Sequence, residues 1–238
     1  MNGTPKHHIS VIIPAFNEEI SLPEVIHELP GDIIEDIIVV DNASNDNTAS
    51  IARQLNCRVI FEPQKGYGKA CLAGISALHP ETEIVVFIDG DHSDHGDRLN
   101  QIVEPIISEG ADFVIGSRAL GKREPGALTP QAYFGNKLAC FLMKWFWGAS
   151  YTDLGPFRAI SYPALKQLKM RDQDFGWTIE MQIKAVEHKL KIKEVPVPYR
   201  RRIGKSKISG TLAGTILAGE KILRTIFLYK FFQCRERP

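Results

Sequence analysis

The feature that most constrains the fold is an alternation of short apolar runs with helix-like segments in the first half of the chain. The apolar runs, at 8–14, 33–41, 58–62, 83–89 and 111–117, are rich in Ile and Val. Segments with helical character lie between them at 17–29, 45–55, 68–78 and 97–110, the last with Pro105 expected to interrupt it. Apolar strands separated by helices are typical of a parallel sheet covered on both faces. The sequence therefore predicts an α/β fold with a mostly parallel central sheet.

Length, charge and cysteine usage narrow the class of protein. The chain has 238 residues, 44% of them hydrophobic, and a net charge of +1, which suits a globular domain with a full core and argues against nucleic-acid binding. The four cysteines show no C-x-x-C spacing, so we expect reduced thiols and a cytoplasmic protein. The polar start, MNGTPKHH, predicts no signal peptide, and no transmembrane helix is expected.

Three of the predicted strands end in polar residues, at 14–18, 41–44 and 89–91. The carboxyl ends of parallel strands meet at one edge of the sheet, where α/β proteins bind ligands. Helix capping explains Asn17 and Asp46 adequately. It does not explain Asp89 and Asp91, which we therefore assign to a ligand site.

Asp89 and Asp91 flank a single glycine, and two such carboxylates repel each other unless a positive charge lies between them. Hard oxygen ligands favour Mg²⁺ or Mn²⁺. Gly90 is expected to let the backbone turn tightly beneath the ion. His92 and His95 do not show the spacing of a zinc site. The segment 65–70, KGYGKA, lacks the Walker spacing, and no G-x-G-x-x-G follows the first strand.

Several ordered motifs carry a resemblance to a known family: VIIPAFNEE, VVDNASNDNT, FIDGDHSDHGDRL, FVIGSR and DLGPFRAI. Over residues 8–210 the chain resembles family 2 glycosyltransferases of the GT-A fold, most closely dolichol-phosphate mannose synthases and related polyprenyl-phosphate sugar transferases. The resemblance implies a GT-A domain at 1–210, and the pattern of the remaining residues, 211–238, predicts an appended C-terminal amphipathic helix. It also implies that Asp89 and Asp91 bind a metal on the diphosphate of a nucleotide-sugar donor.

The same resemblance implies a set of donor-binding residues. The nucleoside is expected to contact Pro14, Phe16, Glu18 and Asp41, and the donor site to include Lys69, Gly90 and Lys207. Relatives often carry two acidic residues where this chain has Asp41 and Asn42, so recognition of the base or ribose is expected to differ. The sequence leaves open whether the donor is a UDP- or a GDP-sugar, and which hexose it carries.

The acceptor is the second open question. The resemblance implies single displacement with inversion, and a polyprenyl phosphate acceptor needs cations and no general base. We assign that role to Arg118 and Arg201, because guanidinium groups bind phosphate through two parallel hydrogen bonds. We expect Lys122 and Arg200 to be solvated.

A hydroxyl on a soluble or lipid acceptor would instead need a carboxylate base, and Asp153 is the candidate. Asp153 has two other expected roles, orienting Arg158 or contacting the sugar. Gln131 stands where relatives usually carry a basic residue, which weighs against the phosphate. An alternative of another class is a nucleotide-sugar-binding protein without turnover. A pyrophosphorylase is disfavoured, because PAFNEE offers no glycine-rich basic loop after the first strand.

Two amphipathic segments bear on partners. Segment 133–148 places an apolar stripe of Phe134, Leu138, Phe141, Leu142 and Trp145 along one face. Segment 211–233 is too charged to span a membrane and too apolar to be freely solvated. The sequence is compatible with three ways of burying the apolar side of this segment: against a bilayer surface, against a second copy in a homodimer, or against its own domain. We favour peripheral membrane contact over dimerisation.

Overall fold

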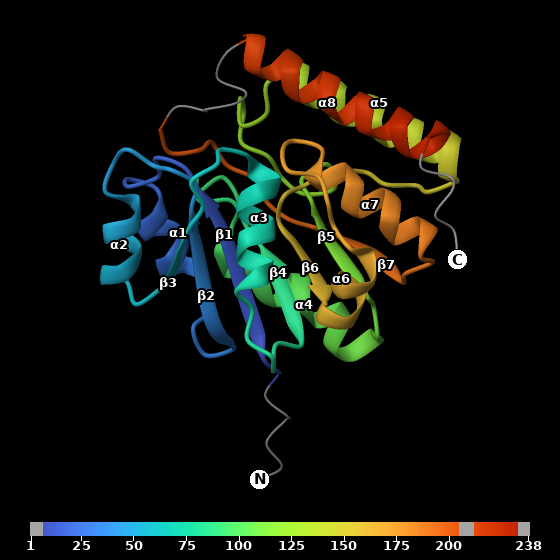
Figure 1. The fold of residues 1–238 in the computed structure, drawn as a ribbon. Coiled ribbons are helices and arrows are strands. Elements are labelled where there is room, and N and C mark those ends of the chain that lie inside the picture. Colours follow the sequence, from blue (N-terminus) through green and yellow to red (C-terminus); the bar gives the residue numbers. More distant parts are fainter. Residues whose placement is uncertain (1–6, 205–211, 233–238) are drawn as a thin grey trace.

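The computed structural model describes residues 7–204 and 212–232, and its centre is a seven-stranded sheet (Figure 1). The strands lie in the order β3-β2-β1-β4-β6-β5-β7. Their bounds are β1 Ile9–Ala15, β2 Ile34–Asp41, β3 Arg58–Phe61, β4 Ile84–Phe87, β5 Phe113–Ser117, β6 Arg158–Ser161 and β7 Ile192–Pro196. All neighbouring pairs are parallel except those of β6, which runs antiparallel to both β4 and β5. The predicted α/β fold with a mostly parallel sheet is confirmed.

Helices cover both faces of the sheet (Figure 1). One face carries α1 Leu22–Glu28, α2 Thr48–Gln54 and α4 Leu99–Glu109, which follows the short 3₁₀ turn η1 Gly96–Arg98. The other face carries α3 Tyr67–Ser76, α5 Pro130–Trp147, α6 Tyr162–Leu168, α7 Trp177–Glu187 and α8 Leu212–Phe231. The predicted boundary between the domain and the C-terminal helix, at residue 210, lies outside the described residues.

Two local expectations about helices need correction or refinement. Pro105 does not interrupt α4, which runs unbroken from Leu99 to Glu109 with this proline buried inside it. The first helix begins only at Leu22, with Pro23 in its first turn, because proline is pre-organised for the start of a helix. The residues before it, 16–21, remain outside the helix and are available to the site at the end of β1.

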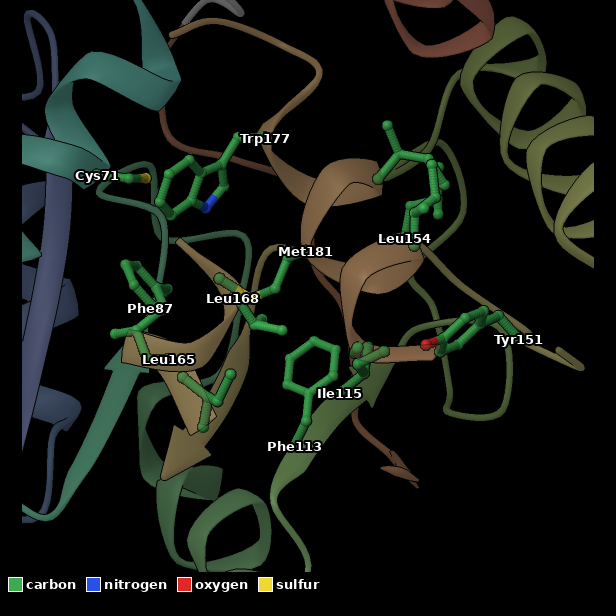
Figure 2. Close-up of a cluster of buried hydrophobic side chains, with 14 of the residues drawn as sticks. Cys71, Phe87, Phe113, Ile115, Tyr151, Leu154, Leu165, Leu168, Trp177 and Met181 are labelled. Carbon is green, nitrogen blue, oxygen red and sulfur yellow. The ribbon is translucent and has the colours of Figure 1, made fainter. Parts of the chain in front are cut away.

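Alternate side chains of the buried strands divide the core into two layers. On the α3 and α7 side, Phe87 packs edge-on against Trp177 with ring centroids 5.9 Å apart (Figure 2). Figure 2 also shows side chains of β5, α6 and α7 that belong to the same layer. Phe87 ends β4, and only Ile88 separates it from Asp89. The core therefore fixes the strand end that carries the two carboxylates.

The helices α5 and α8 lie side by side at the end of the molecule where β1, β2 and β4 terminate (Figure 1). Phe146 of α5 packs edge-on against both Phe227 and Phe231 of α8. Across the described residues, no helix combines the length and the apolar character that crossing a bilayer requires. These two helices, called the roof helices below, therefore cover the edge of the sheet at which the sequence predicts a ligand site.

Candidate active site

A cavity of about 370 Å³ opens at the carboxyl ends of β1, β2 and β4. The three polar strand ends meet there as predicted. Its lining includes Pro14, Ala15, Phe16 and Glu18 after β1, Asn42 after β2, and Asp89, Gly90 and Asp91 after β4. Lys65, Gly66, Tyr67, Ala70, Asp174, Phe175 and Arg202 complete it. This volume is in the range of small-molecule sites.

Asp89 lies between the cavity and the core. Its Oδ1 accepts a 3.0 Å hydrogen bond from the hydroxyl of Tyr67, at the start of α3. Burial raises the pKa of Asp89 to about 7, and the nearby charge of Asp91 adds to the rise. When burial and a neighbouring negative charge disfavour the ionised form of a carboxyl group, a cation placed beside it stabilises that form.

Asp91 is 4% exposed and already bonded on both oxygens. Its Oδ1 accepts from the backbone amide of Ser93 at 2.9 Å and from the Ser93 hydroxyl at 2.5 Å. Its Oδ2 lies 2.8 Å from Nη2 of Arg202. Arg202 was not singled out from the sequence, and nothing in the local pattern of YRRRIG distinguishes it from its two neighbours.

The turn after β4 does not depend on Gly90 as expected. Gly90 has no positive φ, and a Cβ added to it would meet only ordinary contacts at 3.5 Å or more. The left-handed residue in the loop is His92, with φ 63°. Its Nε2 lies 3.1 Å from Oε1 of Glu28 in α1, so that His92 joins the loop to the body of the domain.

Two predicted donor residues are not at the cavity wall. Lys69 directs its Nζ to Oε1 of Gln64 at 2.7 Å, and Lys65 lies at the cavity instead, 4.3 Å above the ring of Phe16. Asp41 accepts from the backbone amide of Ser44 at 3.0 Å and is absent from the lining. Lys69 is displaced because α3 begins at Tyr67, which places Lys69 on the helix and leaves Lys65 in the loop before it.

The hydrogen bonds of Asn42 explain why an amide stands at the end of β2, where relatives often carry a second acidic residue. Its Nδ2 donates to the carbonyls of Glu62 and Gln64, at 3.2 and 2.8 Å. Its Oδ1 accepts from the amide of Gly66 at 2.8 Å. A carboxylate has no donor for those two carbonyls. Asn42 therefore shapes the loop that carries Lys65.

The segment 171–176, between α6 and α7, supplies part of the cavity wall through Asp174 and Phe175. Glu180 of α7, fully buried, accepts from the amides of Arg171 and Asp172 at 2.7–3.1 Å. The hydroxyl of Tyr229 in α8 donates to the same carboxylate at 2.7 Å. Glu180 is thus a buried anchor for this wall and not a surface carboxylate.

A second cavity of about 450 Å³ adjoins the first and shares Tyr67, Asp89, Phe175 and Arg202 with it. Its remaining walls come from the loop 126–129, from both roof helices, and from residues that follow β5 and β7 or precede β6. They include Arg118, Arg201, Tyr199, Leu128, Ala132, Leu154, Ala218 and Ile222. The cavity therefore combines guanidinium groups with an apolar wall that runs onto α5 and α8.

Arg118, which lines this second cavity, forms an ion pair with the buried Asp153. The Arg118 Nε and Nη2 donate to Oδ2 and Oδ1 of Asp153, both at 2.8 Å, and the Arg118 amide also donates to Oδ2 at 2.8 Å. Arg158, the other expected partner, donates instead to the carbonyls of Gly155 and Thr178 at 3.0 Å. Burial alone would raise the pKa of Asp153, but the charge and hydrogen bonds of Arg118 outweigh it and hold the pKa below its usual value.

The three consecutive arginines after β7 have different partners. Arg201 lines the second cavity, and its Nε donates to the carbonyl of Pro125 at 2.7 Å. Arg200 is not solvated as expected: it donates to Glu28 and to the carbonyls of His92 and Asp94. Arg202 faces Asp91. Lys207 lies outside the described residues.

The donor set at Asp89 and Asp91 fits a divalent ion bound together with a phosphate ligand. Mg²⁺ and Mn²⁺ characteristically take one or two carboxylates and fill their other positions with water and substrate phosphate oxygens. The two carboxylates at the cavity match that demand, because burial and the charge of Asp91 raise the pKa of Asp89 and a cation would offset both effects. Within residues 7–204 and 212–232, no group of three His, Cys, Asp or Glu side chains is placed to hold an ion.

Comparisons with solved structures agree with this architecture. Glucosyl-3-phosphoglycerate synthase of Mycobacterium tuberculosis, solved with Mn²⁺, UDP and glucosyl-3-phosphoglycerate, superposes with a TM-score of 0.75 at 22% identity. The match covers 94% of this chain and 80% of that one. At this level of identity the likeness establishes the GT-A fold alone.

Sequence relatives extend over nearly the whole chain. An uncharacterized glycosyltransferase of Mycobacterium tuberculosis, Rv0539, is 34% identical over 216 residues, covering 88% of this chain and 94% of its own. The dolichyl-phosphate hexose transferase of Haloferax volcanii is 31% identical over 223 residues, covering 91% and 92%. Residues 10–168 match the family described as Glycosyl transferase family 2. The polar strand ends, the paired carboxylates and these matches agree, and the chain belongs to glycosyl transferase family 2.

Proposed function

We propose that this glycosyltransferase moves a hexose from a nucleoside-diphosphate sugar to a polyprenyl phosphate, with inversion at the anomeric carbon. The observation that carries the proposal is the second cavity, in which Arg118 and Arg201 lie beside an apolar wall formed by the roof helices. A phosphate with a long hydrocarbon tail is the acceptor that matches both features.

The donor is assigned to the first cavity. Its nucleoside is proposed to lie along Phe16, Lys65 and Asn42, and its diphosphate to reach Asp89 and Asp91. Mn²⁺ or Mg²⁺ held by these two carboxylates would act as a Lewis acid, neutralising charge on the leaving diphosphate. Tyr67 keeps Asp89 oriented through its 3.0 Å hydrogen bond. The sugar would then stand near the residues common to both cavities.

The acceptor phosphate needs positive charge and no base, because it is already a nucleophile at neutral pH. The bond between the sugar and the diphosphate breaks as the acceptor oxygen bonds to the anomeric carbon, and no proton has to be removed. Asp153 supports this choice, because its charge is engaged by Arg118 and its pKa is lowered, which makes it a poor base. A hydroxyl acceptor would require that pair to open.

Two relatives are named for transfer to dolichyl phosphate, which supports the same acceptor class. One is the Haloferax volcanii hexose transferase described above. The other, from Methanococcus voltae, is named UDP-N-acetylglucosamine–dolichyl-phosphate N-acetylglucosaminyltransferase and is 31% identical over 211 residues, covering 79% of this chain and 84% of its own.

The roof surface supports a lipid acceptor independently. Phe134, Leu138, Phe141 and Trp145 form an exposed stripe on α5, and Leu217, Phe227, Leu228 and Phe231 are exposed on α8. Lys137, Lys144 and Arg224 are exposed on the same two helices. Exposed aromatic side chains mixed with cations are typical of surfaces that lie on anionic bilayers. We propose that this surface, the roof face, rests peripherally on a membrane and presents the second cavity to lipid.

The test is a transfer assay with labelled UDP- and GDP-hexoses, Mn²⁺, and three acceptors: a polyprenyl phosphate, the corresponding polyprenol, and buffer alone. We expect label in the lipid phase only with the polyprenyl phosphate. Asp91→Asn should abolish it. Transfer to the polyprenol at an equal rate would contradict the phosphate assignment, and binding of donor without transfer to any acceptor would favour a non-catalytic binding protein.

A further inference from the structure

Arg202 stands at the boundary of the two cavities and faces the carboxylate proposed to hold the metal. It lines both cavities, and its Nη2 lies 2.8 Å from Oδ2 of Asp91. The other oxygen of Asp91 already accepts two hydrogen bonds from Ser93. A divalent ion binding to Asp91 would therefore reach for Oδ2, the oxygen that the guanidinium contacts.

Backbone hydrogen bonds hold the main chain on both sides of Arg202, which leaves any exchange of partners to its side chain. The amide of Ile203 donates to the carbonyl of Asp91 at 3.0 Å, and the amide of Arg200 donates to the carbonyl of Ser93 at 3.1 Å. Arg200 adds hydrogen bonds from its side chain to the carbonyls of His92 and Asp94. The Arg202 side chain is nevertheless 30% exposed, which leaves it room to move toward the cavity.

Two consequences of charge follow. A guanidinium within 3 Å of a ligand oxygen repels an approaching divalent cation and occupies the same lone pairs. A diphosphate offers that guanidinium a second anionic partner with matching two-pronged geometry. Asp91 and a donor diphosphate therefore compete for one arginine, while the metal and that arginine compete for one carboxylate.

We propose that Arg202 is a positioning residue that couples metal binding to nucleotide binding: it pairs with Asp91, transfers to the diphosphate when the donor arrives, and thereby yields Oδ2 to the ion. The inference rests on the proposed donor site but not on the identity of the acceptor. The pairing of Arg202 with Asp91 is therefore expected to make the site bind metal weakly in the absence of nucleotide and strongly in its presence. By linkage, the ion must raise nucleotide affinity by the same factor.

The test measures the affinity of the purified full chain for Mn²⁺ alone, by electron paramagnetic resonance of free Mn²⁺, and again with saturating UDP or GDP. In the wild type we expect nucleotide to tighten Mn²⁺ binding by about tenfold to a hundredfold, the usual range of coupling between sites. Arg202→Gln should tighten the binding of Mn²⁺ alone by about tenfold and weaken nucleotide binding in the presence of Mn²⁺. The coupling factor should fall accordingly. Opposite changes in two affinities are not produced by general loosening of the fold.

Arg201→Gln is the matched control. It removes the same charge from the adjacent position, but its guanidinium donates to Pro125 and not to Asp91. It should leave the affinity for Mn²⁺ alone within about twofold of the wild type. Arg202→Lys, which keeps the charge, should restore weak binding of Mn²⁺ alone. Arg202→Met repeats the test without introducing an amide if the Gln variant is poorly folded by circular dichroism.

Three results would overturn the inference. One is an unchanged or weaker affinity for Mn²⁺ alone in Arg202→Gln and Arg202→Met. Another is the same tightening in Arg201→Gln, which would make the effect one of bulk charge. The third is a wild type that binds nucleotide without any response to Mn²⁺. That third result removes the metal from the proposed donor site as well, whereas the first two leave the proposed function intact.

Discussion

Arg118 and Asp153 are locked together by two side-chain hydrogen bonds of 2.8 Å, and both side chains are largely buried, at 12% and 1% exposed. The pair joins the end of β5 to the segment before β6, and its Arg118 lines the second cavity. Because each charge satisfies the other, Asp153 holds Arg118 in a fixed direction. The arrangement favours Arg118 as the phosphate contact and Asp153 as its support.

Removing one partner of this pair should be costly. Asp153→Asn leaves the Arg118 charge buried without compensation, and such a loss typically lowers the free energy of unfolding by about 3–5 kcal/mol. Urea denaturation at pH 7 measures it. Glu109→Gln is the control, since the Lys193–Glu109 pair is about half exposed and its loss should cost under about 1 kcal/mol. Similar small losses in both variants would show that the Arg118–Asp153 pair does not stabilise the fold.

Asp94 should make stability depend on pH. It is 2% exposed, and neither carboxylate oxygen has a hydrogen-bond partner in the described part of the chain. Burial, followed by the charge of Asp89, raises the pKa of Asp94 well above its usual value. The folded state therefore keeps a proton that the unfolded state releases first, and stability is lost as pH rises above the unfolded pKa.

Asp94→Asn removes that dependence. The difference in free energy of unfolding between the variant and the wild type should increase in favour of the variant by up to about 1.4 kcal/mol for each pH unit above pH 4. Urea denaturation in the presence of EDTA measures it. Asp32→Asn, at an exposed position, should leave the gap to the wild type nearly constant with pH. A constant gap for Asp94→Asn as well would mean that Asp94 is charged in the folded protein.

Gly68 permits the close approach of α3 to the wall segment 171–176. A Cβ at this position would lie 2.1 Å from the carbonyl oxygen of Asp172. Gly68→Ala must therefore push away the backbone that leads to Asp174 and Phe175. We expect it to cost roughly 1–3 kcal/mol of stability and to weaken nucleotide binding in a calorimetric titration.

Gly135→Ala provides the opposite control within α5, because nothing lies within 4 Å of a Cβ added there. Alanine is preferred to glycine inside a helix, so this variant should gain roughly 0.5–1 kcal/mol and bind nucleotide normally. If Gly68→Ala binds nucleotide as well as Gly135→Ala does, the 171–176 wall takes no part in the donor site.

The roof face should bind lipid through its aromatic side chains. Phe141 and Trp145 are 57% and 70% exposed and lie one helical turn apart on α5. Replacing both with Ser should abolish cosedimentation with vesicles containing anionic phospholipid, whereas Phe61→Ser, equally exposed on the edge strand β3, should not. A wild type that ignores vesicles and is a dimer by light scattering, converted to a monomer by the double variant, would make this face a dimer interface instead.

Local pattern predicted the five strands of the first half, because each is a short, β-branched run between helical segments. It also predicted that 14–18, 41–44 and 89–91 meet, since parallel strands end at one edge, although Asn42 lines the cavity and Asp41 does not. The antiparallel insertion of β6 between β4 and β5 follows the long connection 118–157, which contains α5, and depends on pairing between residues far apart in the sequence. The choice of Arg118 over Arg158 as the partner of Asp153, and of Arg202 for Asp91, arises from tertiary packing that no local pattern carries.

The most direct test of the central claim is an anomalous diffraction map, at the manganese absorption edge, of crystals grown with Mn²⁺ and UDP or GDP. The account predicts a single strong peak within bonding distance of the carboxylates of Asp89 and Asp91, in contact with the diphosphate. A nucleotide bound in the first cavity with no manganese at these two residues would contradict it.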